Sequence, residues 1–333
     1  MIEFLSFKPL NNDIDLERIE RFQKMMNHRE ATVCAERAEI LTKSYQATEG
    51  EPIVIRKAKA LKAILNQMSI YIDDDSLIIG NHASTNFAAP IFPEYSFNWL
   101  IEELDDLPKR TGDRFDVDED VKQRLKALQP YWQNKTHQDE VKTNMSELNK
   151  LAAQQNVLHR GGISMSGDGH IVPNHEFVMR HGFRGIMNIA ANKTKQANLD
   201  QDQKDFYQAV QITMSAALDF IKRFSHLATE KAKTTKDLKR KNELIQIADT
   251  FSDLLEGGVR SFYEAVETVY LVHLIMMIES NGHSFSFGRF DQYCYPYYLQ
   301  DIEKGILNEE KALEIITHFF IKVNIFSILI SIM

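Results

Sequence analysis

Apolar residues recur at helical spacing along most of this chain. Leu16, Ile19, Phe22 and Met26, for example, share one helical face because they lie three or four positions apart. Glycine and proline, which interrupt helices, number only 14 and 8 among 333 residues. The spacing predicts further helices over residues 35–47, 58–68, 96–106, 118–130, 138–153, 176–195, 204–232, 236–254, 261–279, 292–303 and 309–323. We therefore expect one mostly helical unit, undivided by any repeat or flexible linker.

Signals for β-structure are few. The best candidate is a β-hairpin with strands over 70–72 and 77–80, joined by an acidic turn over 73–75. Pro90 and Pro93 hold residues 89–94 extended, because proline fixes φ and disfavours a helical residue before it. The sequence thus predicts a mainly α fold with minor β-structure.

The charge balance restricts the possible partners. The chain has 39 Lys and Arg against 47 Asp and Glu, a net charge of −8, whereas a dedicated nucleic-acid binder needs a basic face. The apolar run over 269–278 is too short for a bilayer, which takes about 20 apolar residues, and is interpreted as a buried helix. The first residues do not resemble a secretory signal. We expect a cytoplasmic protein with no nucleic-acid or membrane partner.

Most motifs that announce a particular chemistry are absent. The sequence has no P-loop, no dinucleotide fingerprint, no HExxH and no CxxC. His175, Glu176 and His181 are close together, but their spacing is not that of a zinc protease, and we interpret them as a solvated helix start. Cys34 and Cys294 are far apart and are interpreted as packing residues. No metal site is predicted.

Two glycine-punctuated loops, over 159–175 and 280–289, are more informative. Each places a histidine directly after a glycine, where the backbone can approach a ligand closely: His170 in the first loop and His283 in the second. With Ser284, these side chains could give hydrogen bonds to a small polar substrate in an apolar pocket. The alternative is that His283 caps the preceding helix and His170 orders a turn, and residue chemistry alone leaves both open.

At these loops the sequence resembles the glycyl radical enzymes. The similarity is to the pyruvate formate-lyase-like branch, which includes the B12-independent glycerol and propanediol dehydratases, and it runs from about residue 30 to Asn324. The stretches that carry it are Cys34-Ala35-Glu36-Arg37-Ala38, Ala89-Pro90-Ile91-Phe92-Pro93-Glu94, Gly167-Asp168-Gly169-His170, Glu279-Ser280-Asn281-Gly282-His283-Ser284, Phe287-Gly288-Arg289-Phe290-Asp291-Gln292-Tyr293 and Tyr295-Pro296-Tyr297-Tyr298.

The resemblance implies a fold and a chemistry. The fold is a ten-stranded α/β barrel enclosed by helices, of which this chain would form the N-terminal helical part. A glycyl radical, installed by a radical-SAM activating enzyme, passes to a cysteine whose thiyl takes a hydrogen atom from the substrate, in a protein that is a homodimer. By the same resemblance His170, His283 and Ser284 bind the substrate, a small polar molecule such as a diol. No cofactor would be bound by this chain itself.

The sequence also departs from the family pattern. The cysteine motif Gly-Cys-x-Glu and the radical motif Arg-Val-x-Gly-Tyr do not occur, so no catalytic residue is assigned and the chain is expected to be inactive alone. We expect residues 1–324 to be a partial pyruvate formate-lyase domain and 325–333 an aberrant apolar tail of a truncated product, with a separately encoded C-terminal part as a partner. The alternatives are formate C-acetyltransferase activity in the full-length parent, or a non-catalytic helical binding module.

Overall fold

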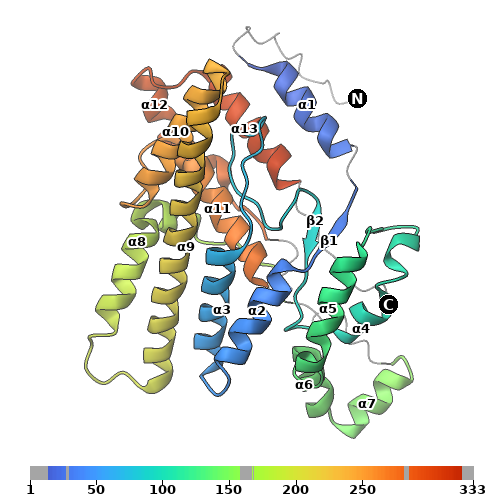
Figure 1. The fold of residues 1–333 in the computed structure, drawn as a ribbon. Coiled ribbons are helices and arrows are strands. Elements are labelled where there is room, and N and C mark those ends of the chain that lie inside the picture. The colour runs from blue at the N-terminus through green and yellow to red at the C-terminus, as the bar shows by residue number, and fades with distance from the viewer. Residues whose placement is uncertain (1–13, 28–29, 158–166, 168, 281–284, 325–333) are drawn as a thin grey trace, which may run out of the picture.

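The computed structural model describes residues 14–27, 30–157, 167, 169–280 and 285–324, and within them helices dominate (Figure 1). The first half holds α1 (Leu16–Asn27), β1 (Thr32–Cys34), α2 (Glu36–Ala47), α3 (Ile53–Gln67), β2 (Ala88–Pro90), α4 (Asn98–Glu103), the 3-10 turn η1 (Leu107–Lys109), α5 (Glu119–Trp132), α6 (His137–Asn144) and α7 (Glu147–Gln154). The second half holds α8 (His175–Lys193), α9 (Gln201–Thr234), α10 (Leu238–Leu254), α11 (Phe262–Ser280), α12 (Phe290–Glu303) and α13 (Glu309–Val323). The predicted fold class, mainly α with minor β, is confirmed.

The longest helix, α9, organises one side of the molecule. It packs against α3, α8 and α10, and these helices run alongside it in Figure 1. On the other side of α3, α2 connects this layer to α5. Helix α11 contacts α8, α10, α12 and α13, and α1 lies on α13. Helices far apart in sequence therefore share one body.

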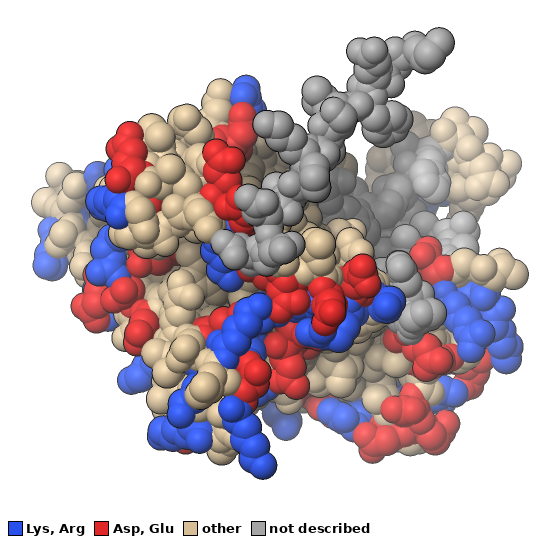
Figure 2. All heavy atoms as spheres, turned by 90° about the horizontal axis from the view of Figure 1, so that it is seen from above, with Lys and Arg blue, Asp and Glu red and all other residues tan. Residues whose placement is uncertain are grey.

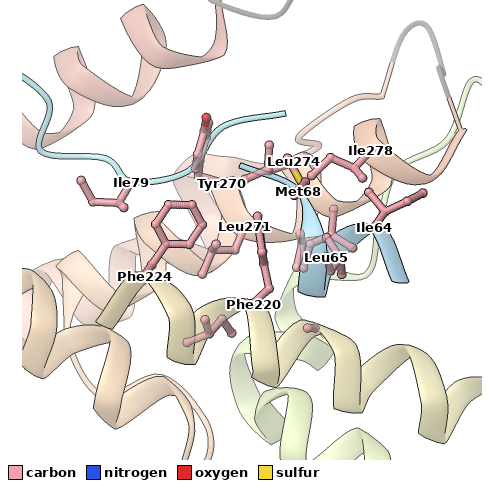
Figure 3. Packing of buried hydrophobic residues seen from close by; sticks show 14 of the residues in the cluster. Ile64, Leu65, Met68, Ile79, Phe220, Phe224, Tyr270, Leu271, Leu274 and Ile278 are labelled. Carbon is pink, nitrogen blue, oxygen red and sulfur yellow. The ribbon is translucent and has the colours of Figure 1, made fainter. Parts of the chain in front are cut away.

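A single large apolar core holds α3, α9 and α11 together (Figure 3). Phe220 and Phe224 of α9 point toward Leu271 of α11, and Ile64 of α3 closes the same cluster. Phe220, Phe224 and Leu271 have no exposed surface. Removing such side chains from water is the main favourable contribution to folding. The apolar run predicted to be a buried helix is confirmed as α11.

The β-hairpin predicted over 70–80 is wrong. The structure has no strand there; residues 77–80 instead run along α11, whose polar side chains bind their backbone. Tyr263 Oη donates to the carbonyl oxygen of Leu77 at 2.5 Å, and the backbone N–H of Ile79 donates to the Glu267 carboxyl group at 3.2 Å. Buried backbone groups need partners, and here helix side chains take the place of a second strand.

The two strands that do form were not predicted as a pair. β1 and β2 are parallel, with Val33 opposite Ala89 and Cys34 opposite Pro90. The expectation of extended chain at Pro90 is confirmed, because β2 ends at that residue. The helix predicted over 138–153 is two helices, since the Ser146 side chain accepts a hydrogen bond from the N–H of Asn149 and begins α7 anew.

The acidic stretch over 73–75 is a point of attachment for basic side chains. Asp73, Asp74 and Asp75 pair with Lys322, Lys231 and Arg21, with N···O distances of 2.7, 3.1 and 2.6 Å respectively. A further ion pair, Arg18 Nη2 to Glu243 Oε1 at 2.7 Å, joins α1 to α10 beneath the surface. These contacts agree with the interpretation of 73–75 as a turn.

The surface gives no sign of a nucleic-acid face on the side that Figure 2 displays. Acidic and basic side chains are interspersed there instead of forming a basic patch. Among the helices of the described residues, none has the length and apolar character needed to cross a membrane.

Candidate functional site

The two glycine-punctuated loops lie side by side. The backbone N–H of Ser286 donates to the carbonyl oxygen of Ile171 at 3.0 Å. A Cβ atom on Gly169 would lie 3.6 Å from Phe285 Cε1, which places the first loop directly against the second. Segments more than 100 residues apart in sequence therefore meet where the sequence analysis placed its candidate site.

Gly167 brings the first loop onto the end of α11. A Cβ atom there would lie 2.6 Å from Tyr95 Oη and 3.0 Å from the carbonyl oxygen of Ser280, so a larger residue would push the loop away. Ser280 is the last residue of α11 and immediately precedes the second loop. A glycine at this position thus allows the loop before His170 to approach the start of the loop that carries His283.

Of the three predicted substrate-binding residues, the structure describes one. His170 is exposed on the first loop and is not held as a cap of α8, which Asn174 caps with its side chain. His283 and Ser284 lie outside the described residues, between Ser280 and Phe285. The neighbouring segments are close, and the convergence of the three side chains stays a prediction.

A pair of buried histidines below the loops was missed by the sequence analysis. His175 was interpreted as part of a solvated helix start, and this is wrong: it is 2% exposed at the start of α8. Its ring centroid lies 5.4 Å from that of Tyr293, and among the residues that the structure describes neither ring nitrogen has a hydrogen-bond partner. His273 of α11 lies 4.7 Å from the ring of Phe287.

Burial dictates the charge state of these histidines. It lowers the pKa of His175 to about 4, because the charged imidazolium loses its hydration. The pKa of His273 is also lowered to about 4, mainly by burial and further by the nearby His175. Both rings are neutral at pH 7 and provide an apolar, aromatic floor beneath residues 285–287. The aromatic positions Phe285, Phe287 and Tyr293 are the only sequence signal that could have suggested a covered site.

An ion pair lies behind the loops. Arg37 of α2 and Glu94 are almost fully buried, with Arg37 Nη2 2.5 Å from Glu94 Oε1, and the guanidinium stacks 3.6 Å from the ring centroid of Phe92. Three of the sequence stretches that carry the family resemblance, 34–38, 89–94 and the one that begins at Glu279, meet at this pair. The residues that carry the family resemblance in these three stretches therefore have a structural role at this ion pair.

A hollow opens beside Glu94 and Tyr95, which form part of its wall. It is a cavity of about 870 Å³ between the α2–α3 turn and helices α5 and α6. Arg56 on its wall donates to the carbonyl oxygen of Tyr45 at 2.9 Å and lies over the Tyr45 ring, and Lys57 lies over the ring of Tyr95. The sequence analysis did not single out this cavity, because its lining comes from four separate elements.

Neither cysteine is exposed. Cys34 ends β1, with its Sγ 3.2 Å from Ser84 Oγ, and Cys294 is buried in α12. Burial raises the pKa of the Cys294 thiol to about 12, so this thiol is protonated at neutral pH. Both observations agree with packing. Within the described ranges, no three His, Cys, Asp or Glu side chains come together in a way that could hold a metal ion.

Comparisons with known proteins identify the class. The family described as "Pyruvate formate lyase-like" matches residues 11–331, and the chain belongs to this family. It is 37% identical over 295 residues to the Escherichia coli (strain K12) protein named "Probable dehydratase YbiW", covering 87% of this chain and 36% of that protein. The family resemblance inferred from the loops is thereby confirmed.

Solved structures agree in fold. The glycerol-bound form of the B12-independent glycerol dehydratase from Clostridium butyricum superposes with a TM-score of 0.90 at 38% identity, covering 94% of this chain and 40% of that one. A structure from a study of 1,2-propanediol dehydration in Roseburia inulinivorans gives 0.90 at 32% identity, covering 93% and 38%. The chain thus spans a little over a third of the length of the relatives it matches.

Proposed function

We propose that this chain supplies substrate-binding loops of a glycyl radical dehydratase that acts on a small diol or a similar hydroxylated molecule. The observation that carries the proposal is the juxtaposition of the two loops, with Ser286 bonded to Ile171 and Gly167 set against Ser280. Relatives named for glycerol and 1,2-propanediol chemistry share the fold of this region.

In this proposal the role of each residue follows from its hydrogen-bonding capacity. A neutral imidazole donates with one ring nitrogen and accepts with the other, and a serine hydroxyl does both. His170, His283 and Ser284 could therefore orient two neighbouring hydroxyl groups, which is what loss of water from a diol requires. The rings of Phe285 and Phe287, which pack against His273, would exclude solvent beneath them.

The radical chemistry would come from sequence outside these 333 residues, because neither radical motif occurs in them. The proposal therefore includes the remaining part of the fold, on the same or a separate chain, a radical-SAM activating enzyme and a second copy of the assembled protein in a reducing cytoplasm. The one cofactor is the protein-borne glycyl radical, which supplies hydrogen-atom abstraction when present.

The test is a chimera. Residues 14–324 of this chain replace the matched part of the Clostridium butyricum glycerol dehydratase, the product is activated anaerobically, and aldehyde formation from glycerol and 1,2-propanediol is measured. The glycyl radical signal in electron paramagnetic resonance reports folding and activation independently of substrate. We expect dehydration of at least one diol.

Variants of the chimera then test the site. His170→Ala should lower kcat/KM about 5- to 150-fold, since a substrate hydroxyl left without its partner in a closed pocket costs about 1–3 kcal/mol. His226→Ala is the matched control, because His226 is an exposed histidine on α9, far along the sequence from the loops. A chimera that carries the radical but dehydrates neither diol, or that forms acetyl-CoA from pyruvate instead, contradicts the proposal. Equal kcat/KM for His170→Ala and the control would remove His170 from the site.

A further inference from the structure

Arg37 satisfies all of its hydrogen-bond donors with groups from two distant segments. A guanidinium has five N–H groups. Nε donates to the carbonyl oxygen of Ile278 at 2.7 Å, and Nη2 donates to that of Glu279 at 3.0 Å. Nη1 donates to the carbonyl oxygen of Ile91 at 3.1 Å, and the Glu94 carboxylate accepts the remaining two bonds at 3.1 and 2.5 Å. The side chain is 4% exposed, so water cannot replace these partners.

The acceptors on α11 are those that a helix end leaves open. The last carbonyl groups of a helix have no partner within the helix and carry partial negative charge. Ile278 and Glu279 belong to the last turn of α11, directly before the second loop. Arg37 itself lies in the first turn of α2, where the helix dipole disfavours a positive charge. The guanidinium of Arg37 therefore stabilises the end of α11 and does not stabilise the start of α2.

The segment from Ile91 to Tyr95 extends the same contact to the first loop. Ile91 and Glu94 bind Arg37, and Tyr95, the next residue, lies against Gly167. The backbone carbonyls of Glu94 and Tyr95 accept bonds from the first N–H groups of α6, both at 2.9 Å, which fixes this segment from the outside. One short segment thus contacts Arg37 on one side and the first loop on the other.

We propose that Arg37 is a positioning residue that fixes the spacing of the two candidate substrate loops. It lies behind the site and acts through the end of α11 and through residues 91–95, without touching the substrate. Its importance for substrate rests on the proposed function, whereas its hold on the two loops is a property of this chain alone.

Hydrogen–deuterium exchange of the full chain tests the hold directly. The variants are Arg37→Ala and Arg37→Lys, the second of which keeps the charge but cannot bind the three carbonyl groups and the carboxylate together. The matched control is Arg223→Ala, because Arg223, although less buried than Arg37, also donates to two carbonyls at the end of a helix, those of Leu65 and Met68 at the end of α3, at 2.5 and 2.6 Å.

Both Arg37 variants should raise exchange about tenfold or more in peptides over 169–174, 276–280 and 285–289, because a lost bond to a charged group shifts a local opening equilibrium by at least that factor. Arg223→Ala should raise exchange near 65–72 and leave the loops unchanged. Millimolar guanidinium should restore protection in Arg37→Ala, because it can occupy the space that the arginine side chain leaves. It should not change the exchange of the two loops in Arg223→Ala, where no loop protection is lost.

Faster exchange in only one of the two loops, equal loop exchange in the Arg223→Ala control, or no protection by guanidinium in a folded Arg37→Ala would overturn the proposal. If Arg37→Ala does not fold, Arg37→Lys decides by the same peptides. A chimera inactive toward diols would remove the proposed function and leave these exchange results intact, so the two failures are distinguishable.

Discussion

Replacing Gly182 with alanine should destabilise the protein strongly. Gly182 bends α8 with φ 63° and ψ 168°, a backbone region that only glycine adopts readily. A Cβ atom at this position would also collide with the carbonyl group of Gly257, which lies in the connection between α10 and α11. The half of α8 before the bend carries His175 below the candidate site.

The size of the effect can be worked out from these two contributions. Holding alanine in this backbone region costs about 1–3 kcal/mol. The collision costs about 1–3 kcal/mol more, because backbone atoms must move to make room. Any such movement also strains the 2.7 Å hydrogen bond from the Val259 N–H to the Met179 carbonyl oxygen, next to the bend. We expect the free energy of unfolding to fall by about 2–6 kcal/mol.

Urea unfolding followed by circular dichroism measures this loss, and Gly257→Ala is its control. Gly257 is the residue on the other side of the same contact, but a Cβ atom there would meet nothing within 4 Å. Gly257→Ala should therefore change the free energy of unfolding by less than about 1 kcal/mol. A loss below about 1 kcal/mol in Gly182→Ala, or equal losses in both variants, would refute the reasoning from backbone strain.

The remaining predictions concern pH, radical formation and one buried hydrogen bond. The pKa values of His175, His273 and His318 are lowered to about 4, 4 and 3 from 6.5, so stability is full above pH 6.5 and lost as pH falls toward 4. Each of these histidines should lower the free energy of unfolding by about 1 kcal/mol between pH 7 and pH 5.5, as measured by urea unfolding, and His175→Phe should make that pH dependence less steep. This chain treated anaerobically with an activating enzyme should give no glycyl radical signal, and a doublet in electron paramagnetic resonance would contradict us. Thr42→Val should lower the free energy of unfolding by about 1–3 kcal/mol, because it removes the acceptor, 2.8 Å away, of the buried Trp132 indole N–H; an unchanged urea midpoint would count against that bond.

Some helices with a clear apolar face could be predicted from the sequence almost to the residue, whereas α3 begins five residues before the range predicted for it. The helix expected over 309–323 is α13, with the same bounds, because its apolar stripe begins after Asn308, whose side chain caps the first turn. The α2 helix, expected over 35–47, begins one residue later. These elements depend on local spacing and capping, which the sequence displays directly.

The hairpin over 70–80 failed for a reason that local spacing does not contain. Its apolar residues are suited to a strand, but the partner of residues 77–80 is a helix nearly 190 positions away. Glu267 and Tyr263 look like ordinary interruptions of an apolar helix in the sequence. Burial raises the pKa of Glu267 well above its usual value. The hydrogen bond that its carboxyl group accepts from the Ile79 N–H offsets part of the cost of burying it.

The sequence analysis singled out two loops that the structure brings side by side, but it did not find the residues that support them. The position of His170 and the glycines could be predicted because the loop composition is unusual. His175 could not, because both of its neighbours in sequence, Asn174 and Glu176, are exposed, and part of its cover comes from Tyr293 of α12. The structural role of Arg37 could not be predicted either, because the groups that accept its hydrogen bonds lie more than 50 and more than 240 positions away in the sequence.

Helix α11 explains why these supports share one design. Nearly all of its residues are buried, so a polar side chain within it is costly to bury unless another polar group binds it. Glu267 and Tyr270 bind the backbone of residues 79 and 80 near its middle, and its final carbonyls bind Arg37. The same helix thus fixes an irregular segment along its length and the start of a candidate substrate loop at its end. In this helix, which is apolar on every side, Glu267, Tyr270 and the last carbonyl groups bind distant parts of the chain. A polar residue in such a helix is therefore first a candidate for a structural contact, and only then for a catalytic role.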